Sequence, residues 1–93
     1  MPNAHVRHIM VANEEECLAL KARIEGGEDF ADCATKNSKC PTGRRGGNLG
    51  IVKPGQLVDE VDEVVFSGEL RKIHGPVKSQ FGYHVIQILG RTD

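Results

Sequence analysis

The chain has 93 residues, a formal net charge of −1 from 12 basic and 13 acidic residues, and 39% apolar residues. This length allows one small domain over residues 1–93, and frequent Val, Ile and Leu at low net charge exclude a disordered chain. The balanced charge argues against a dedicated nucleic-acid binder, and no apolar run approaches the roughly 20 residues that span a bilayer.

The start of the chain lacks the basic and apolar regions of a signal peptide, so we expect a cytoplasmic protein. The three cysteines, Cys17, Cys33 and Cys40, are odd in number, widely spaced and without a CxxC pair. This pattern predicts neither a disulfide framework nor a zinc site. Residues 36–53 contain five cations and no acid, which we interpret as a solvated loop, with a functional patch as the alternative.

The first predicted elements are a strand over residues 6–11 and a helix after Asn13. The β-branched residues of the strand favour extended structure and place three side chains on one face, those of Val6, His8 and Met10. Asn13 and Glu16 have the spacing of a capping box. Apolar residues then recur at helical intervals until Gly26-Gly27, where we expect a left-handed exit.

The middle of the chain is predicted to hold a second helix and a long loop. Asp29 is expected to cap a short helix whose inner face carries Phe30, Cys33 and Ala34. Residues 37–50 are rich in Ser, Thr, Pro and Gly, which indicates a long loop of the kind that often carries function. Residues 49–52 are expected to form a brief strand.

The last third is predicted as one helix and two strands. Valines at 3–4 residue spacing over 58–65 indicate an amphipathic helix that Ser67-Gly68 ends, with a strand as the alternative. Residues 75–78 and 83–89 are expected to be extended and joined around Gly82. This order predicts the α+β class, with helices packed on a small, mostly antiparallel sheet.

Three residues are candidates for chemistry. His8 and His84 are polar residues within apolar strands; either alone is typical of a hydrogen-bonded core, but the two imidazoles would face each other if their strands are neighbours. Cys40 follows Lys39 in the loop, and cationic neighbours favour a thiolate with a lowered pKa. A Cys/His nucleophilic pair is therefore a hypothesis, although no oxyanion hole or protease signature accompanies it.

Six short motifs follow one another along the chain: His8-Ile9-Met10-Val11, the run CPTGRRGGNLG over residues 40–50, Pro54-Gly55-Gln56-Leu57, Val64-Val65-Phe66, Gly75-Pro76-Val77 and Phe81-Gly82-Tyr83-His84-Val85-Ile86. Together they resemble the parvulin-type peptidyl-prolyl cis–trans isomerases, most closely the small bacterial members. The resemblance implies a four-stranded antiparallel sheet surrounded by four short helices, within the FKBP-like superfold. It also implies isomerisation of Xaa-Pro bonds in unfolded or flexible segments to assist folding, without cofactor or metal.

The resemblance also implies site residues. His8 and His84 match the paired histidines at the floor of the family's site, and Ser79 matches a hydroxyl that completes their network. Cys40 matches a group that contacts the rotating carbonyl, with a nucleophilic role as the weaker alternative. The proline pocket is carried over onto Leu49, Leu57 and Val61, with Phe81 at its rim.

The chain departs from the family pattern at two pocket positions and in one loop. Leu57 stands where Met is usual, and Val61 stands where Phe is usual, which predicts a weakened isomerase. The alternative function is therefore a weakly active or inactive domain that binds proline-containing peptides like a chaperone. Glutamates at 14–16 replace the cations of phospho-directed members, which predicts no phosphate specificity. We expect a monomer whose partners are proline-containing polypeptides, not nucleic acid or membrane.

Overall fold

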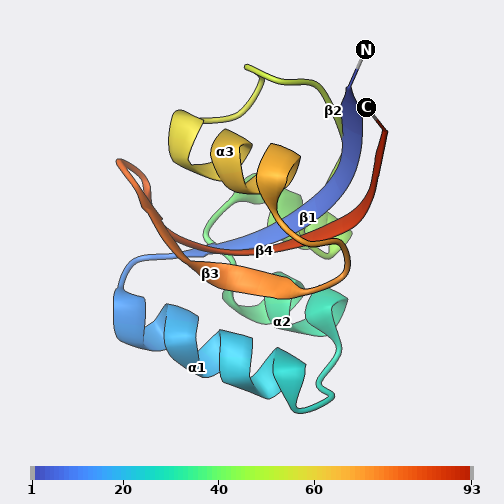
Figure 1. Ribbon diagram of the computed structural model, residues 1–93. Coiled ribbons are helices and arrows are strands. Elements are labelled where there is room, and N and C mark those ends of the chain that lie inside the picture. Colours follow the sequence, from blue (N-terminus) through green and yellow to red (C-terminus); the bar gives the residue numbers. More distant parts are fainter. Residues whose placement is uncertain (1, 93) are drawn as a thin grey trace.

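A computed structural model describes residues 2–92, in which four strands form one antiparallel sheet (Figure 1). The strands are β1 (Asn3–Val11), β2 (Asn48–Val52), β3 (Ile73–Ser79) and β4 (Gly82–Thr92), and they lie in the order β2-β1-β4-β3. The first and last strands are therefore the central pair. β1, β3 and β4 extend beyond the predicted ranges because residues at their ends, such as Ala4 and Ile73, also pair with neighbouring strands.

Helices cover both faces of the sheet. α1 (Glu14–Glu25) and α2 (Phe30–Asn37) lie below it in Figure 1, and α3 (Asp59–Ser67) lies above it. The fourth helix implied by the family resemblance is a 3-10 helix, η1 (Pro41–Arg45). No helix within residues 2–92 has the length and apolarity that crossing a membrane requires.

The prediction of an uninterrupted loop over residues 37–50 is wrong where η1 forms. Pro41 at the first helical position has its φ already set for a helical turn and loses no needed N–H. Gly46 then ends the turn in the left-handed conformation, with φ of 68°. The helix expected around the valines of 58–65 does form, as α3.

The predicted caps begin the first two helices. The Asn13 side chain accepts from the Glu16 N–H at 2.8 Å, and the Asp29 side chain accepts from the Asp32 N–H at 3.0 Å. At the end of α1 the left-handed residue is Gly27, with φ of 111°, whereas Gly26 remains right-handed.

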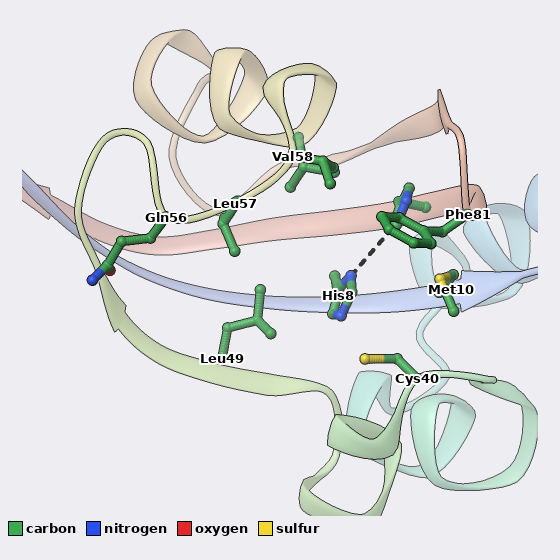
Figure 2. Close-up of a pocket in the computed structure, with 10 residues that line it drawn as sticks. His8, Met10, Cys40, Leu49, Gln56, Leu57, Val58 and Phe81 are labelled. Atoms are coloured by element: carbon green, nitrogen blue, oxygen red, sulfur yellow. Dashed lines mark hydrogen bonds between the residues drawn. The ribbon is translucent and has the colours of Figure 1, made fainter.

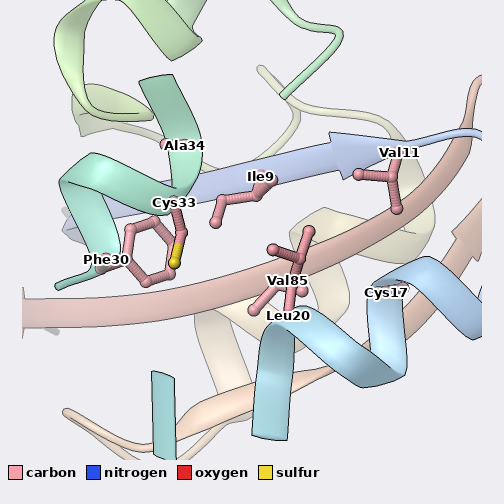
Figure 3. Close-up of a cluster of buried hydrophobic side chains, with 8 residues drawn as sticks. All are labelled: Ile9, Val11, Cys17, Leu20, Phe30, Cys33, Ala34 and Val85. Atoms are coloured by element: carbon pink, nitrogen blue, oxygen red, sulfur yellow. The ribbon is translucent and has the colours of Figure 1, made fainter. Parts of the chain in front are cut away.

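Alternation along the central strands divides the apolar residues between two cores. Below the sheet, α1 and α2 pack on a cluster formed by Ile9, Val11, Cys17, Leu20, Phe30, Cys33, Ala34 and Val85 (Figure 3). Above it, α3 packs on a cluster formed by Ala4, Val6, Val52, Val61, Val65 and Ile86. His8 and Met10 continue the upper face of β1 beyond Val6 and line a pocket instead.

Arg91, near the end of β4, supports the C-terminus of α3. Its Nη1 donates to the carbonyl oxygens of Val65 at 3.0 Å and Gly68 at 2.7 Å. These carbonyls belong to the end of a helix, where backbone acceptors lack helical partners and a cation is favoured.

We predict that Arg91→Ala lowers the free energy of unfolding by about 1–2 kcal/mol, because two charge-assisted hydrogen bonds are lost. Urea denaturation followed by circular dichroism measures this loss. The matched control is Arg45→Ala, an exposed arginine of η1, which should change stability by less than about 0.5 kcal/mol. Equal losses in the two variants would contradict a role for Arg91 as a helix cap.

Candidate active site

A pocket of about 360 Å³ opens on the upper face of the sheet beside α3 (Figure 2). β1 and β4 supply its floor, the segment around residues 56–58 and the start of α3 supply one wall, and Cys40 closes the opposite side. Its lining is predominantly apolar and consists of His8, Met10, Cys40, Leu49, Gln56, Leu57, Val58, Val61, Phe81 and His84. A cavity of this kind suits a small apolar ring better than a charged ligand.

Two histidines form the floor of the pocket. His8 on β1 and His84 on β4 are only 7% and 3% exposed, and their Nδ1 atoms lie 3.3 Å apart. Their rings are nearly parallel, with an angle of 12° and a centroid separation of 5.4 Å. Met10 is the partner of His84 in the β1–β4 register, and His8 precedes Met10 by two residues on the same face of β1. The two histidines are therefore diagonal neighbours on one face of the sheet.

The histidine pair belongs to a longer chain of hydrogen bonds. On one side, the Ser79 hydroxyl lies 2.7 Å from His84 Nε2 and accepts from the Phe81 N–H. On the other, the Thr42 hydroxyl lies 3.3 Å from His8 Nε2 and donates to Cys40 Sγ at 3.2 Å.

One arrangement of protons satisfies every link of this chain. Because the Thr42 hydroxyl donates to sulfur, it accepts from His8 Nε2–H, which leaves His8 Nδ1 as an acceptor. His84 then donates from Nδ1, and its Nε2 accepts from the Ser79 hydroxyl. Both imidazoles are neutral in this arrangement, and each carries a different tautomer.

Burial keeps the pair neutral. Burial, and to a lesser extent the neighbouring His84, lower the pKa of His8 to about 4. Burial also lowers the pKa of His84, although the negative charge of Glu60 partly opposes this effect. Two imidazolium rings would both donate and would repel each other, so the Nδ1–Nδ1 hydrogen bond requires that at least one ring remain uncharged.

Backbone hydrogen bonds hold Cys40 and Thr42 over β1. The Lys39 N–H donates to the Met10 carbonyl at 2.7 Å. Gly47 donates to the Thr42 carbonyl at 2.8 Å and accepts from the His8 N–H at 2.9 Å. Gly47 has φ of 82°, and a Cβ there would come within 2.2 Å of the His8 carbonyl oxygen. Only glycine permits this close approach, which places the sulfur beside the histidines.

Comparisons with known proteins identify the family of the chain. A model of the PPIC-type PPIase domain matches residues 1–92. The chain belongs to the PPIC-type peptidyl-prolyl isomerase family, the parvulins. Its similarity to the chaperone SurA of Methylococcus capsulatus is 39% identity over 103 residues, which cover all of this chain and 23% of SurA. The parvulin domain thus spans about a quarter of the length of this curated relative.

Solved structures of parvulins share the fold. The peptidylprolyl isomerase PrsA from Bacillus anthracis superposes with a TM-score of 0.95 at 29% identity, over 99% of this chain and 43% of PrsA. NmPin, the parvulin of Nitrosopumilus maritimus, superposes with a TM-score of 0.88 at 30% identity, over 97% of this chain and 98% of NmPin. The four-stranded α+β architecture expected from the sequence is therefore confirmed.

The structure brings the residues implied by the parvulin resemblance to one place. Seven of them line the pocket: His8, Cys40, Leu49, Leu57, Val61, Phe81 and His84. The eighth, Ser79, lies outside the lining and hydrogen-bonds His84. Phe81 is 61% exposed at the rim, whereas Val61 is buried and also belongs to the upper core.

Four residues of the site were not predicted as site residues. Met10, Gln56 and Val58 line the pocket, and Thr42 connects His8 to Cys40. The shared face of Val6, His8 and Met10 was a signal for Met10. For Thr42 the sequence carries no signal, because the turn of η1 alone brings its hydroxyl back over β1.

We predict that the protein loses stability as the pH falls from 7 to 5. The unfolded histidine takes up a proton near its ordinary pKa of about 6.5, whereas folded His8 stays neutral down to about pH 4. Unfolding therefore binds protons in this window, and its free energy decreases as the pH falls.

Urea midpoints measured at pH 7 and pH 5 test this dependence. His8→Asn should reduce the difference between the two midpoints, because it removes one of the buried rings. A wild-type midpoint that is equal or higher at pH 5 would show that the histidine pair is not held neutral.

Proposed function

We propose that this domain catalyses the cis–trans isomerisation of Xaa-Pro peptide bonds in unfolded or flexible protein segments, and so assists folding. The observation that carries the proposal is the apolar pocket whose floor is a neutral, hydrogen-bonded histidine pair and whose side is a cysteine. Membership of the isomerase family and the similarity to PrsA, named a peptidylprolyl isomerase, support it.

Rotation about a peptide bond needs no covalent step. The barrier of about 18–20 kcal/mol comes from the loss of amide resonance, and the twisted bond is less charge-separated than the planar one. A pocket that holds the proline ring and strips water from the carbonyl favours the twisted state over both planar states. In our proposal Leu49, Leu57 and Val61 hold the ring, and Phe81 covers it at the rim.

The polar groups would act on the carbonyl that precedes proline. Thr42 donates its hydroxyl proton to Cys40 Sγ, so the thiol proton is free to point toward the substrate carbonyl as a weak donor. The histidine pair and Ser79 position this group from below through the same hydrogen-bond chain. We assign Cys40 this polar contact rather than a nucleophilic role, because the transfer of a bond to sulfur is unnecessary for rotation.

We also propose that the site is not specific for phosphorylated residues. The glutamates at 14–16 form the first turn of α1, shortly after Met10 of the pocket. Their negative charges would oppose a phosphate dianion that approaches the first turn of α1.

A second candidate function is a binding module for proline-containing segments. Val61 leaves the pocket without the aromatic wall usual in the family, and the exposed ring of Phe81 offers an apolar contact that needs no catalysis. The relative named chaperone SurA supports this reading. It predicts peptide binding without acceleration of exchange.

Compartment and assembly complete the proposal. We propose a cytoplasmic domain, since Cys17, Cys33 and Cys40 are free thiols, as a reducing compartment permits. We also propose that it is a monomer. Fractionation of the native host and analytical ultracentrifugation of the purified chain would test these two points.

The decisive experiment measures cis–trans exchange of unphosphorylated Xaa-Pro peptides by NMR, with substoichiometric protein. We expect acceleration that falls at least about tenfold in His8→Ala and in Cys40→Ala, which corresponds to about 1.4 kcal/mol of lost selective stabilisation. His5→Ala is the matched control, because this histidine lies on β1 outside the pocket and should leave the rate unchanged.

Two outcomes of this experiment would change the assignment. Peptide shifts without acceleration would favour the binding module. When a phosphoserine-proline peptide is added to the set, faster isomerisation of this peptide than of its glutamate counterpart would contradict the absence of phosphate specificity.

We further predict that Val61→Phe raises kcat/KM for these peptides by several-fold. The larger side chain restores an aromatic wall and adds about 1–2 kcal/mol of contact with the proline ring. A urea denaturation curve of the variant controls for overpacking, because Val61 is also a core residue. A variant that folds normally and shows no gain in kcat/KM would contradict the assignment of Val61 to the proline-binding wall.

A further inference from the structure

A second cavity, of about 530 Å³, adjoins the proline pocket and shares Cys40 with it. We name it the Lys39–Arg44 pocket, after the two cations among the residues of η1 and its preceding turn that line it. A substrate held over Cys40 would therefore have this cavity beside it. Because Cys40 lines both cavities, a residue adjacent to the bound proline would lie next to this cavity.

The cations of this pocket are available to an anionic ligand. The two ion pairs that form within residues 2–92 are Arg23–Glu28 and Lys72–Glu69, and neither uses Lys39 or Arg44. Both cations are exposed, and no acidic residue occurs between positions 36 and 53. The charged side chains of this segment are therefore all positive, although the whole chain carries a formal charge of −1.

A hydroxyl donor lies in the same pocket. Ser38 Oγ accepts from the Met10 N–H at 3.1 Å and from the Cys40 N–H at 3.3 Å. These two contacts use the oxygen as an acceptor and leave its own proton to be donated. Lys39, Arg44 and Ser38 thus present two charges and one neutral donor, a set that matches a carboxylate.

We propose that the Lys39–Arg44 pocket binds the carboxylate side chain of a glutamate or aspartate that precedes the substrate proline. The inference rests on the proposed function, in which the carbonyl before proline lies against Cys40. The residue that carries this carbonyl is then the one nearest the shared wall.

Negative charge at the opposite end of the proline pocket favours one orientation of a bound peptide that carries an acidic residue. The residues next to Val58 include Asp59 and Glu60, which border a smaller cavity there. Glu60 acts on the floor of the site as well, since its charge raises the pKa of His84. An acidic side chain is repelled at this end, so we expect discrimination only for the residue before proline.

The test compares peptides that differ at one position. Peptides with glutamate, glutamine or lysine before proline are measured for exchange rate and, by NMR titration, for Kd; a second set carries these residues after proline. We expect glutamate before proline to be preferred over glutamine about two- to fivefold, the range of an exposed ion pair. The preference should shrink in about 0.5 M salt and should be absent when glutamate follows proline.

The variant Lys39→Gln/Arg44→Gln should bring the ratio between glutamate and glutamine peptides close to one. Arg45→Gln is the matched control, because it removes the same charge from the same short helix at a residue outside the cavity lining. It should retain most of the preference. The readout is the ratio between the two peptides and not the absolute rate, because Lys39 and Arg44 belong to the proposed binding site.

Failure of this inference is distinguishable from failure of the proposed function. If the glutamine peptide is accelerated but glutamate brings no gain in rate or Kd, the isomerase stands and the carboxylate pocket is wrong. If no peptide is accelerated, the proposed function fails, and the Kd ratio still decides on the pocket. A preference that persists in the double variant, or is lost equally in Arg45→Gln, overturns the assignment to Lys39 and Arg44.

Discussion

The hydrogen bond between His8 and His84 depends on the central pairing of β1 with β4. A single-residue slip of either strand would turn one imidazole toward the opposite face, where α1 and α2 pack. The register Met10↔His84 prevents this and brings the two Nδ1 atoms to 3.3 Å. Because the rings are buried and neutral, each must find a partner for both nitrogens, and the hydroxyls of Ser79 and Thr42 supply the remaining two.

Backbone hydrogen bonds to β1 also hold one segment of irregular structure in place. Residues 38–47 have no strand or α-helix of their own, yet Lys39 and Gly47 bond to the backbone of β1 on either side of η1. The close approach at Gly47 places Thr42 above His8 and carries Cys40 with it. The cysteine and the Lys39–Arg44 pocket therefore take their positions from the central strands and not from the loop itself.

Stability and the proposed activity share residues on the upper face of the sheet. Val61 packs in the core beneath α3 and also forms a wall of the pocket, and Leu49 and Leu57 pack against the same core. Arg91 holds the end of α3 from the far end of β4. Substitutions of these pocket residues therefore change the free energy of unfolding as well as the binding of the peptide. A change in activity can be interpreted only when the stability of the variant has also been measured.

The amino-acid sequence determined the α-helices, the strands and the family of this protein, but not the 3-10 helix η1, because caps, apolar periodicity and six ordered motifs are local properties of the chain. It also named the histidines and Cys40 as members of one site through the resemblance. It could not show that Thr42 joins His8 to Cys40 or that Gln56 lines the pocket. Those contacts arise only when β1 and β4 meet and η1 turns back over them. The hydrogen bond from His8 to Thr42 joins residues that are 34 positions apart in the chain, and the one from His8 to His84 joins residues that are 76 positions apart, so both depend on tertiary packing that no local pattern encodes.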